Sequence, residues 1–364
     1  MGKRVYDLYP QVYAFENLLF AERDAARGKR GRPDVAAYEY HLEDELLKLG
    51  DALREKRWAP GAYRRHTVRE PKERVISAAP YRDRVVHHAL TRVLEPVYAR
   101  RFIPDSYASR LGKGTHRALD RATQFARHFP YVLRCDIVEF FPAMDHAVLR
   151  ALFRGVIGDQ DALWLCDRVL EGGARELVNQ YTPVCFPGDG ETAPIRPRGL
   201  PVGNQTSQFW ANVYLDPLDQ FVKRVLRCEG YLRYVDDFLL FAPDKHTLHG
   251  WRREIIAFLA TLRLTLHEAR AAVLPATAGI PFLGFRVYPD HRLLRRRNAV
   301  AFARRYRALR ADYAAGSIPF ERLNASVQGW VAHAAHGDTW GLRSRLLADR
   351  VLPPSDAKGE PLFA

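Results

Sequence analysis

The stretch "GYLRYVDDFLLFAP", residues 230–243, consists of two apolar runs separated by the adjacent carboxylates Asp236 and Asp237. Each run is rich in β-branched, aromatic and leucine residues, which predicts a strand on either side. The acidic pair falls where a two-residue hairpin turn would lie, although such turns favour Asn-Gly or Asp-Gly. Two like charges at this place disfavour the turn, so stability alone does not explain them.

Apolar residues at helical spacing predict helices in much of the remaining chain. We expect a helix over residues 34–57 with Asp34 as its N-cap after Pro33, and another over residues 83–100 that Pro96 bends or ends. Four more helices are expected: after the N-cap Asp145, from about Thr206 with a kink or restart at Pro217, around residues 245–264, and through most of the chain after Leu293.

Short apolar segments predict the strands. One is "YVLRCDIVEFF", residues 131–141, and a strand pair lies near "IPFLGFRVYPD", residues 280–290. Residues 186–204 are dense in proline and glycine and are expected to form a loop. Tight hairpins indicate an antiparallel sheet, so we expect an α+β fold rather than a doubly wound parallel sheet.

Composition narrows the class of binding partner that the chain is expected to have. The chain has 364 residues and a net charge of +14, which favours a polyanion such as nucleic acid. An arginine-rich composition also follows from a GC-rich genome, and composition does not separate the two explanations. No apolar run approaches the roughly 20 residues of a membrane span, so no membrane role is expected. Four cysteines without a C-x-x-C pair indicate a reducing cytoplasm.

A second carboxylate, Asp136, ends its strand "YVLRCD" as Asp236 ends "YLRYVD". A single aspartate at such a place is usually a capping or solvated residue, but the two strands together suggest one cluster. Clustered carboxylates stay ionised only with a cation among them, and oxygen ligands favour Mg²⁺. Two such ions stabilise the attacking and leaving oxygens of phosphoryl transfer. Without a phosphate-binding G-x-x-x-x-G-K loop, Lys72 and Arg74 are the candidates for contacting phosphate.

Five segments in order now resemble the motifs of reverse transcriptases: "PKERVISAAPYRDRVVHHAL", "RCDIVEFF", "GLPVGNQTSQFWAN", "YVDD" and "FLGF". The resemblance implies a right-hand polymerase fold with fingers, a palm built on an antiparallel sheet, and a helical thumb. It divides the chain into N-terminal helices and fingers (1–130), the first part of the palm (131–150), a fingers/palm insertion (151–198), the palm with the YVDD hairpin and primer grip (199–291), and a basic helical thumb and tail (292–364).

The resemblance also implies roles for single residues. Asp136, Asp236 and Asp237 resemble the catalytic aspartates, which with the carbonyl of Ile137 bind two Mg²⁺ ions, Mn²⁺ being an alternative. Phe141 resembles the steric gate against a ribose 2′-hydroxyl, although Phe140 beside it competes for that role. The remaining expected residues bind the dNTP (Lys72, Arg74, Val202, Gly203 and Gln208) or form the primer grip (Phe282, Leu283, Gly284 and Phe285).

Two departures point to a subfamily. Val202 stands where many reverse transcriptases have glutamine, and "LPVGNQTSQ" together with the tail "SVQGWVAHAAHGDTWGLRSRL" is similar to the enzymes of diversity-generating retroelements. That resemblance implies an error-prone, bacterial or phage-encoded cytoplasmic enzyme. Its partners are an RNA template, a DNA or RNA primer, dNTPs and a small basic accessory variability protein. Arg270 lies near the place of a lysine that often follows the catalytic hairpin, which puts a general acid there in doubt.

Other classes stay open at this point. Within the family, the alternative is a group II intron-like, retron-like or defence-associated reverse transcriptase. A non-catalytic RNA-binding scaffold of the same fold is a further alternative, but it would not need mutually repelling carboxylates. A metal-dependent nuclease would need neither the basic segment around Lys72 nor the aromatic residue Phe141.

Overall fold

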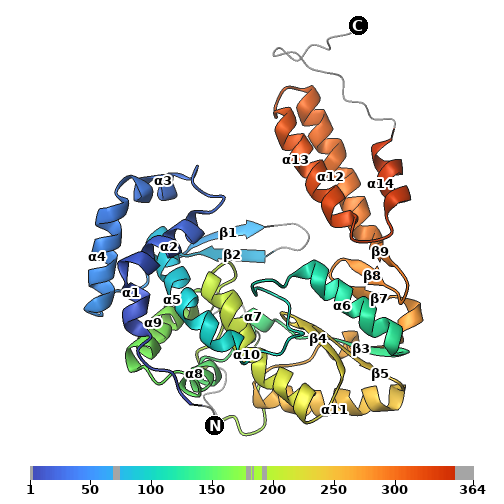
Figure 1. Ribbon diagram of the computed structural model, residues 1–364, viewed down its shortest axis with the longest axis horizontal. Helices are drawn as coiled ribbons and strands as arrows, with labels where there is room; N and C mark the ends of the chain where they lie inside the picture. Colours follow the sequence, from blue (N-terminus) through green and yellow to red (C-terminus); the bar gives the residue numbers. More distant parts are fainter. Residues whose placement is uncertain (1–2, 69–73, 178–181, 183, 191–194, 349–364) are drawn as a thin grey trace.

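The N-terminal part of the computed structural model is mainly helical (Figure 1). The structure describes residues 3–68, 74–177, 182, 184–190 and 195–348. Strands β1 (Arg64–Val68) and β2 (Arg74–Ala78) form an antiparallel hairpin that projects from this helical part. Its helices are α1 (Tyr9–Tyr13), α2 (Phe15–Ala26), α3 (Pro33–Tyr40), α4 (Leu42–Arg54) and α5 (Tyr81–Ala99).

The prediction of one helix over residues 34–57 is wrong, because the structure has two helices there, α3 and α4, which meet at His41. Pro33 is the first residue of α3 and Arg32 its N-cap, so Asp34 lies inside the first turn instead of capping it. Proline suits that first position because the missing N–H has no partner there anyway. Asp34 pairs with Arg84 of α5 at 2.5 Å, while Pro96 lies within α5 without ending it.

A four-stranded antiparallel sheet, called the central sheet below, is the largest sheet among the described residues. Its order is β4 (Gly230–Tyr234), β5 (Asp237–Ala242), β3 (Tyr131–Asp136) and β6 (Ala272–Pro275). The antiparallel prediction is therefore confirmed. The strand expected to reach residue 141 ends at Asp136, because the left-handed Glu139 (φ 45°) turns the chain into the short helix α7 (Phe140–Ala143).

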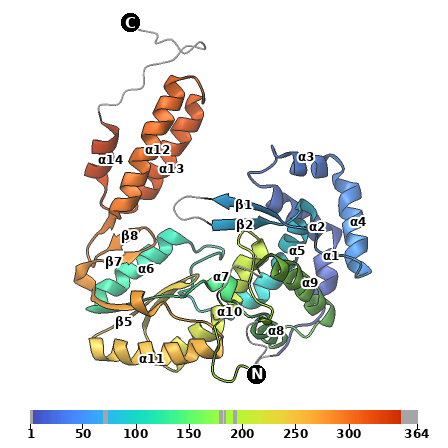
Figure 2. The same ribbon diagram turned by 180° about the vertical axis from the view of Figure 1, so that it is seen from behind.

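Helices cover both faces of the central sheet (Figure 2). Alternate residues of β3 face opposite cores: Leu133 and Cys135 lie in the larger core with α10 (Gln205–Arg224) and α11 (Lys245–Thr261), and Val132 lies in a second core with α6 (Thr115–His128). The predicted N-cap Asp145 is confirmed, since its side chain accepts hydrogen bonds from Ala147 N and Val148 N at the start of α8. The remaining helices here are α8 (His146–Arg154) and α9 (Gln160–Leu177).

The C-terminal part packs on the second core. The predicted strand pair is confirmed as β7 (Ile280–Phe282) and β8 (Phe285–Val287), and β9 (Arg292–Leu294) extends it to three antiparallel strands. Helices α12 (Arg296–Ala314), α13 (Phe320–Ala334) and α14 (Trp340–Leu347) stand away from the central sheet (Figures 1 and 2). Among the helices that the structure describes, none combines the length and apolarity that crossing a membrane requires.

Candidate active site

The central sheet brings the predicted carboxylates together at one edge. Asp136 is the last residue of β3 and Asp237 the first of β5, and the two are direct partners in the antiparallel register. Neighbouring partners of such a register have side chains on the same face within reach of one another. Asp236 precedes Asp237 at the end of the β4–β5 hairpin. Two segments one hundred residues apart in sequence thus form one acidic edge.

The hairpin turn differs from the prediction by one residue. Tyr234 pairs with Asp237, so the two turn residues are Val235 and Asp236 rather than the two aspartates. Val235 has φ 58°, a left-handed conformation that is unusual for a β-branched side chain and costs on the order of 1–3 kcal/mol. The surrounding sheet therefore holds a strained turn beside the acidic edge.

Burial and like charge both disfavour ionisation of Asp237. Burial is the larger cause, and together with the neighbouring charges of Asp136 and Asp236 it raises the pKa of Asp237 to about 6. Arg134 opposes this shift, with its Nε 3.4 Å from Asp237 Oδ1. A cation at this edge would relieve the same repulsion.

Two arginines occupy the acidic edge, and neither role was predicted. Arg134 contacts Asp237, and Arg270 Nη1 lies 3.1 Å from Asp136 Oδ2. The position of Arg134 could have been read from the sequence, since residues two apart on a strand share a face and Arg134 precedes Asp136 by two. The contact of Arg270 depends on the path of residues 264–271 past the end of β3, which the sequence does not indicate.

The acidic edge has the donor chemistry that Mg²⁺ prefers, namely carboxylate and carbonyl oxygens. Val138 N donates to Thr265 O and His267 N to Asp136 O, so the peptide groups of Ile137 between them point away from that neighbouring strand and toward the side of β5. In the described residues, however, no three histidine, cysteine or acidic side chains stand close enough to hold a metal ion as they are arranged. Arg134 and Arg270 contact two of the expected ligands, so a bound cation has to compete with these guanidinium groups.

The neighbouring phenylalanines occupy different environments. Phe140 is buried in the core and packs edge-on against Tyr214, whereas Phe141 is half-buried. The carbonyl of Phe141 accepts a hydrogen bond from Leu200 N at 2.9 Å, which ties α7 to the "GLPVG" loop. Of the two, only Phe141 retains exposed surface for contact with a nucleotide.

The "GLPVG" loop lies against the β1–β2 hairpin. Gly203 has φ 119°, and a Cβ there would come within 3.3 Å of Ile76 Cγ2 on β2, so glycine permits this close approach. Val202 is half-buried beside it. Gln208 is exposed on α10 and its Oε1 accepts a hydrogen bond from Ser109 Oγ at 3.1 Å.

The structure does not test the two residues expected to contact the triphosphate. Lys72 lies outside the described residues. Arg74 begins β2, and the structure describes only its backbone. Both roles stay predictions.

The four expected primer-grip residues form the tight β7–β8 hairpin. Phe282 and Phe285 are paired across it and buried, so they support the hairpin from within the core. Leu283 (φ 44°) and Gly284 (φ 89°) form the turn, and both are partly exposed. Of these four residues, Leu283 and Gly284 are therefore the two with surface for direct contact with nucleic acid.

Comparison with known proteins identifies the family of the chain. The model of the family described as "Reverse transcriptase (RNA-dependent DNA polymerase)" matches residues 67–287, more than half of the chain. "Group II intron-encoded protein LtrA" of Lactococcus lactis subsp. cremoris is 25% identical over 222 residues, 60% of this chain and 34% of that protein. The chain thus spans about a third of that relative's length.

Two further likenesses extend over more of the chain. "Protein YkfC" of Escherichia coli K12 is 24% identical over 300 residues, which are 71% of this chain and 73% of that protein. Among solved structures, apo telomerase from Candida tropicalis, truncated from its C-terminal domain, aligns with a TM-score of 0.46 at 12% identity, covering 70% of this chain and 60% of the other.

Proposed function

The chain belongs to the reverse transcriptase family, and from that premise we propose that it is an RNA-directed DNA polymerase, which extends a DNA or RNA primer along an RNA template with dNTPs. The observation that supports this best is the register of the central sheet, which sets Asp136 opposite Asp237 with Asp236 in the adjoining turn. Such an arrangement suits metal-assisted nucleotidyl transfer. In this proposal the β1–β2 hairpin belongs to the fingers, the central sheet is the palm, and α12–α14 belong to the thumb.

In the proposed mechanism, Asp136, Asp236, Asp237 and the Ile137 carbonyl hold two Mg²⁺ ions, for which Mn²⁺ is an alternative. When bound, the two ions stabilise charge on the attacking and leaving oxygens of an in-line displacement. Arg134 and Arg270 balance the carboxylates of Asp237 and Asp136 when no cation is present.

The nucleotide is proposed to lie between the palm and the fingers. Phe141, whose side chain is half-buried, forms the steric gate against a ribose 2′-hydroxyl. Val202 and Gly203, beside β2, line the base and sugar, and Gln208 adds a polar group. Lys72 and Arg74 contact the triphosphate, and Leu283 and Gly284 position the primer end.

The experiment that tests this function is primer extension on an RNA template with Mg²⁺. Asp236→Asn should abolish extension, because an amide binds a divalent cation far more weakly than a carboxylate, and should leave RNA affinity within about twofold. Asp290→Asn is the control, since it also removes one negative charge but at an exposed position of the β8–β9 connection. Extension by Asp236→Asn at the wild-type rate would refute the proposed role.

Within the family, we propose the error-prone enzyme of a diversity-generating retroelement, encoded by a bacterium or phage, cytoplasmic and assisted by a small basic accessory variability protein. The support is Val202, whose side chain cannot donate a hydrogen bond where many relatives carry glutamine. Val202→Gln should lower misincorporation opposite template adenine. Unchanged misincorporation would show that this residue does not set fidelity.

The second candidate is a group II intron-like reverse transcriptase, and the likeness to an intron-encoded protein favours it. The genomic surroundings distinguish the two. A template and variable repeat pair that differs at adenines, with a small accessory gene, supports the retroelement. A surrounding group II intron supports the alternative.

A further inference from the structure

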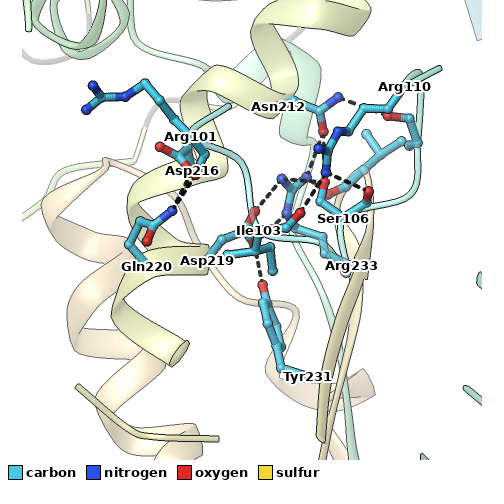
Figure 3. A network of polar contacts seen from close by, with 12 residues as sticks. Arg101, Ile103, Ser106, Arg110, Asn212, Asp216, Asp219, Gln220, Tyr231 and Arg233 are labelled. Atoms are coloured by element: carbon cyan, nitrogen blue, oxygen red, sulfur yellow. Dashed lines mark hydrogen bonds and ion pairs between the residues drawn. The ribbon is translucent and has the colours of Figure 1, made fainter. Parts of the chain in front are cut away.

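Arg233 lies in a buried polar network with Asp219 and Tyr231 (Figure 3), two residues before the strained Val235 of the turn. It belongs to β4, and its side chain has no exposed surface. Side chains alternate along a strand, so Tyr234 shares the face of its partner Asp237, whereas Arg233 points to the opposite face, which α10 covers. A guanidinium buried there cannot touch a substrate at the acidic edge.

Arg233 is oriented by a bidentate contact with Asp219 of α10. Arg233 Nε lies 2.8 Å from Asp219 Oδ1 and Nη2 lies 2.7 Å from Oδ2, and both side chains are fully buried. Tyr231 donates to Asp219 Oδ1 at 2.7 Å, while Ser106 Oγ and Asn212 Oδ1 each accept from Arg233 at 3.2 Å. The bidentate contact with Asp219 fixes the plane of the guanidinium, because both of its bonds depend on the forked geometry.

One donor of this guanidinium reaches the turn itself. Arg233 Nη1 donates to the carbonyl of Val235 at 2.9 Å. That carbonyl belongs to the peptide whose nitrogen is that of Asp236, so the bond fixes the peptide plane from which Asp236 departs. Val235 is in the left-handed conformation (φ 58°), which a β-branched residue leaves readily once its peptide can rotate.

The backbone of Arg233 is held as firmly as its side chain. Its N–H donates to Asp105 O at 2.9 Å and its carbonyl accepts from Tyr107 N at 2.9 Å. The loop at residues 105–107 therefore anchors β4 on the side away from β5. The guanidinium that donates to the Val235 carbonyl thus extends from a backbone position that hydrogen bonds hold in place.

We propose that Arg233 is a positioning residue for Asp236: oriented by Asp219, its guanidinium holds the Val235 carbonyl so that the strained turn presents Asp236 beside Asp136 and Asp237. The inference rests on the proposed function, because the placement of Asp236 matters to a reaction only if the acidic edge is catalytic. Arg233 acts through the turn and makes no contact with substrate.

Arg233→Lys is the first test. Lysine keeps the charge, but one ammonium cannot hold both oxygens of Asp219 and the Val235 carbonyl in fixed directions. Because a small misplacement of a reacting group costs up to about 100-fold in rate, we expect kcat to fall about 10- to 100-fold with the KM for dNTP nearly unchanged. Hydrogen–deuterium exchange should rise in the peptide that covers residues 230–243 and not in α10.

Ser106→Ala and Tyr231→Phe are the matched controls. Each removes one hydrogen bond from the same buried network and leaves the contact between Arg233 and the Val235 carbonyl in place. Both should keep the wild-type kcat and the wild-type exchange of the turn, even where they lower thermal stability. A loss of kcat in the controls equal to that of Arg233→Lys would overturn the proposal.

A double variant covers the case in which a single change prevents folding. Arg233→Met with Asp219→Leu removes both buried charges, and apolar replacement of a buried ion pair often preserves the fold. It should fold, lose kcat and show fast exchange at the turn. Wild-type kcat and exchange in either variant would show that Arg233 does not position the turn, and failure of both to fold would show that its role is structural instead. If the wild-type chain extends no primer, the proposed function fails, and the exchange comparison still decides whether Arg233 holds the turn.

Discussion

The negative charge of Asp237 destabilises the folded protein. Its burial, and the proximity of Asp136 and Asp236, raise its pKa to about 6, and the contact with Arg134 offsets only part of that shift. Under the proposed function such a group is retained for chemistry rather than for stability, since displaced pKa values cluster at active sites. The strained Val235 two residues earlier adds to the same local cost.

Asp237→Asn should therefore stabilise the metal-free protein at neutral pH. Between the ordinary pKa of 3.8 and the folded value of about 6, the folded state holds more protons than the unfolded one, so stability falls as pH rises through this range. Removing the group should raise the free energy of unfolding by on the order of 2 kcal/mol at pH 8. Urea unfolding at pH 8 and at pH 4.5 measures the difference, which should shrink at the lower pH. A variant less stable than wild type at pH 8 would contradict the shift.

Phe141 should control the choice between deoxyribose and ribose. Phe141→Val shortens the half-buried side chain and should raise incorporation of ribonucleotides relative to deoxynucleotides by about 10-fold or more. Single-nucleotide extension with each substrate measures the ratio. Phe140→Leu is the control: it removes volume from the core beside Tyr214 and should lower stability without changing sugar choice. If Phe140→Leu changed sugar choice and Phe141→Val did not, Phe140 would be the steric gate and Phe141 the packing residue.

At the scale of elements, the β7–β8 hairpin depends on its glycine. Gly284 has φ 89°, and its carbonyl accepts from Asn298 Nδ2 at 3.1 Å and from Arg295 N at 3.0 Å. The turn therefore joins the hairpin to the beginning of α12. We therefore expect a disturbance of the turn to affect the start of α12 as well.

Gly284→Ala should lower the free energy of unfolding by about 1–3 kcal/mol, because the added Cβ would meet Asn298 Nδ2 at 2.8 Å in a left-handed conformation. It should also weaken template–primer binding more than RNA binding alone. Gly329→Ala is the matched control: nothing lies within 4 Å of its Cβ position on α13, so stability should stay equal or rise. Fluorescence anisotropy and thermal unfolding give the two readouts.

Local patterns were sufficient to predict many elements. The Asp145 cap, the β4–β5 hairpin and the β7–β8 pair follow from residues adjacent in sequence, and the structure contains all three. The break at His41 and the one-residue shift of the turn to Val235 were not predicted, because packing and strand register decide them. The same limit explains the arginines: Arg270 and Asp136 are 134 residues apart, and only the tertiary fold brings them into contact.

At the scale of the whole molecule, the charge of +14 predicts binding that depends steeply on salt. Exposed arginines lie along α12: Arg296, Arg297, Arg304, Arg305 and Arg307. If about six phosphates are contacted, affinity for template–primer should fall about 1,000-fold between 50 and 200 mM salt. The double change Arg296→Gln and Arg297→Gln should reduce the slope of log affinity against log salt by about 2. Arg27→Gln, at an exposed position beyond α2, is the control. An equal change of the salt slope in that variant would mean that binding depends on the net charge of the protein and not on the arginines of α12.

The order of strands in the central sheet also bears on how the chain acquires its fold during synthesis. β3 lies between β5 and β6, so both of its neighbours are translated after it, and the second ends only at Pro275. About 100 residues separate the end of β3 from the start of β5, so at about 5–20 residues per second β3 waits roughly 5–20 s on the ribosome with both edges unpaired. Its apolar residues Val132 and Leu133 are exposed to solvent or to chaperones during that interval. A pause in translation between residues 140 and 230 should therefore lower the soluble yield, while a pause after residue 290 should not.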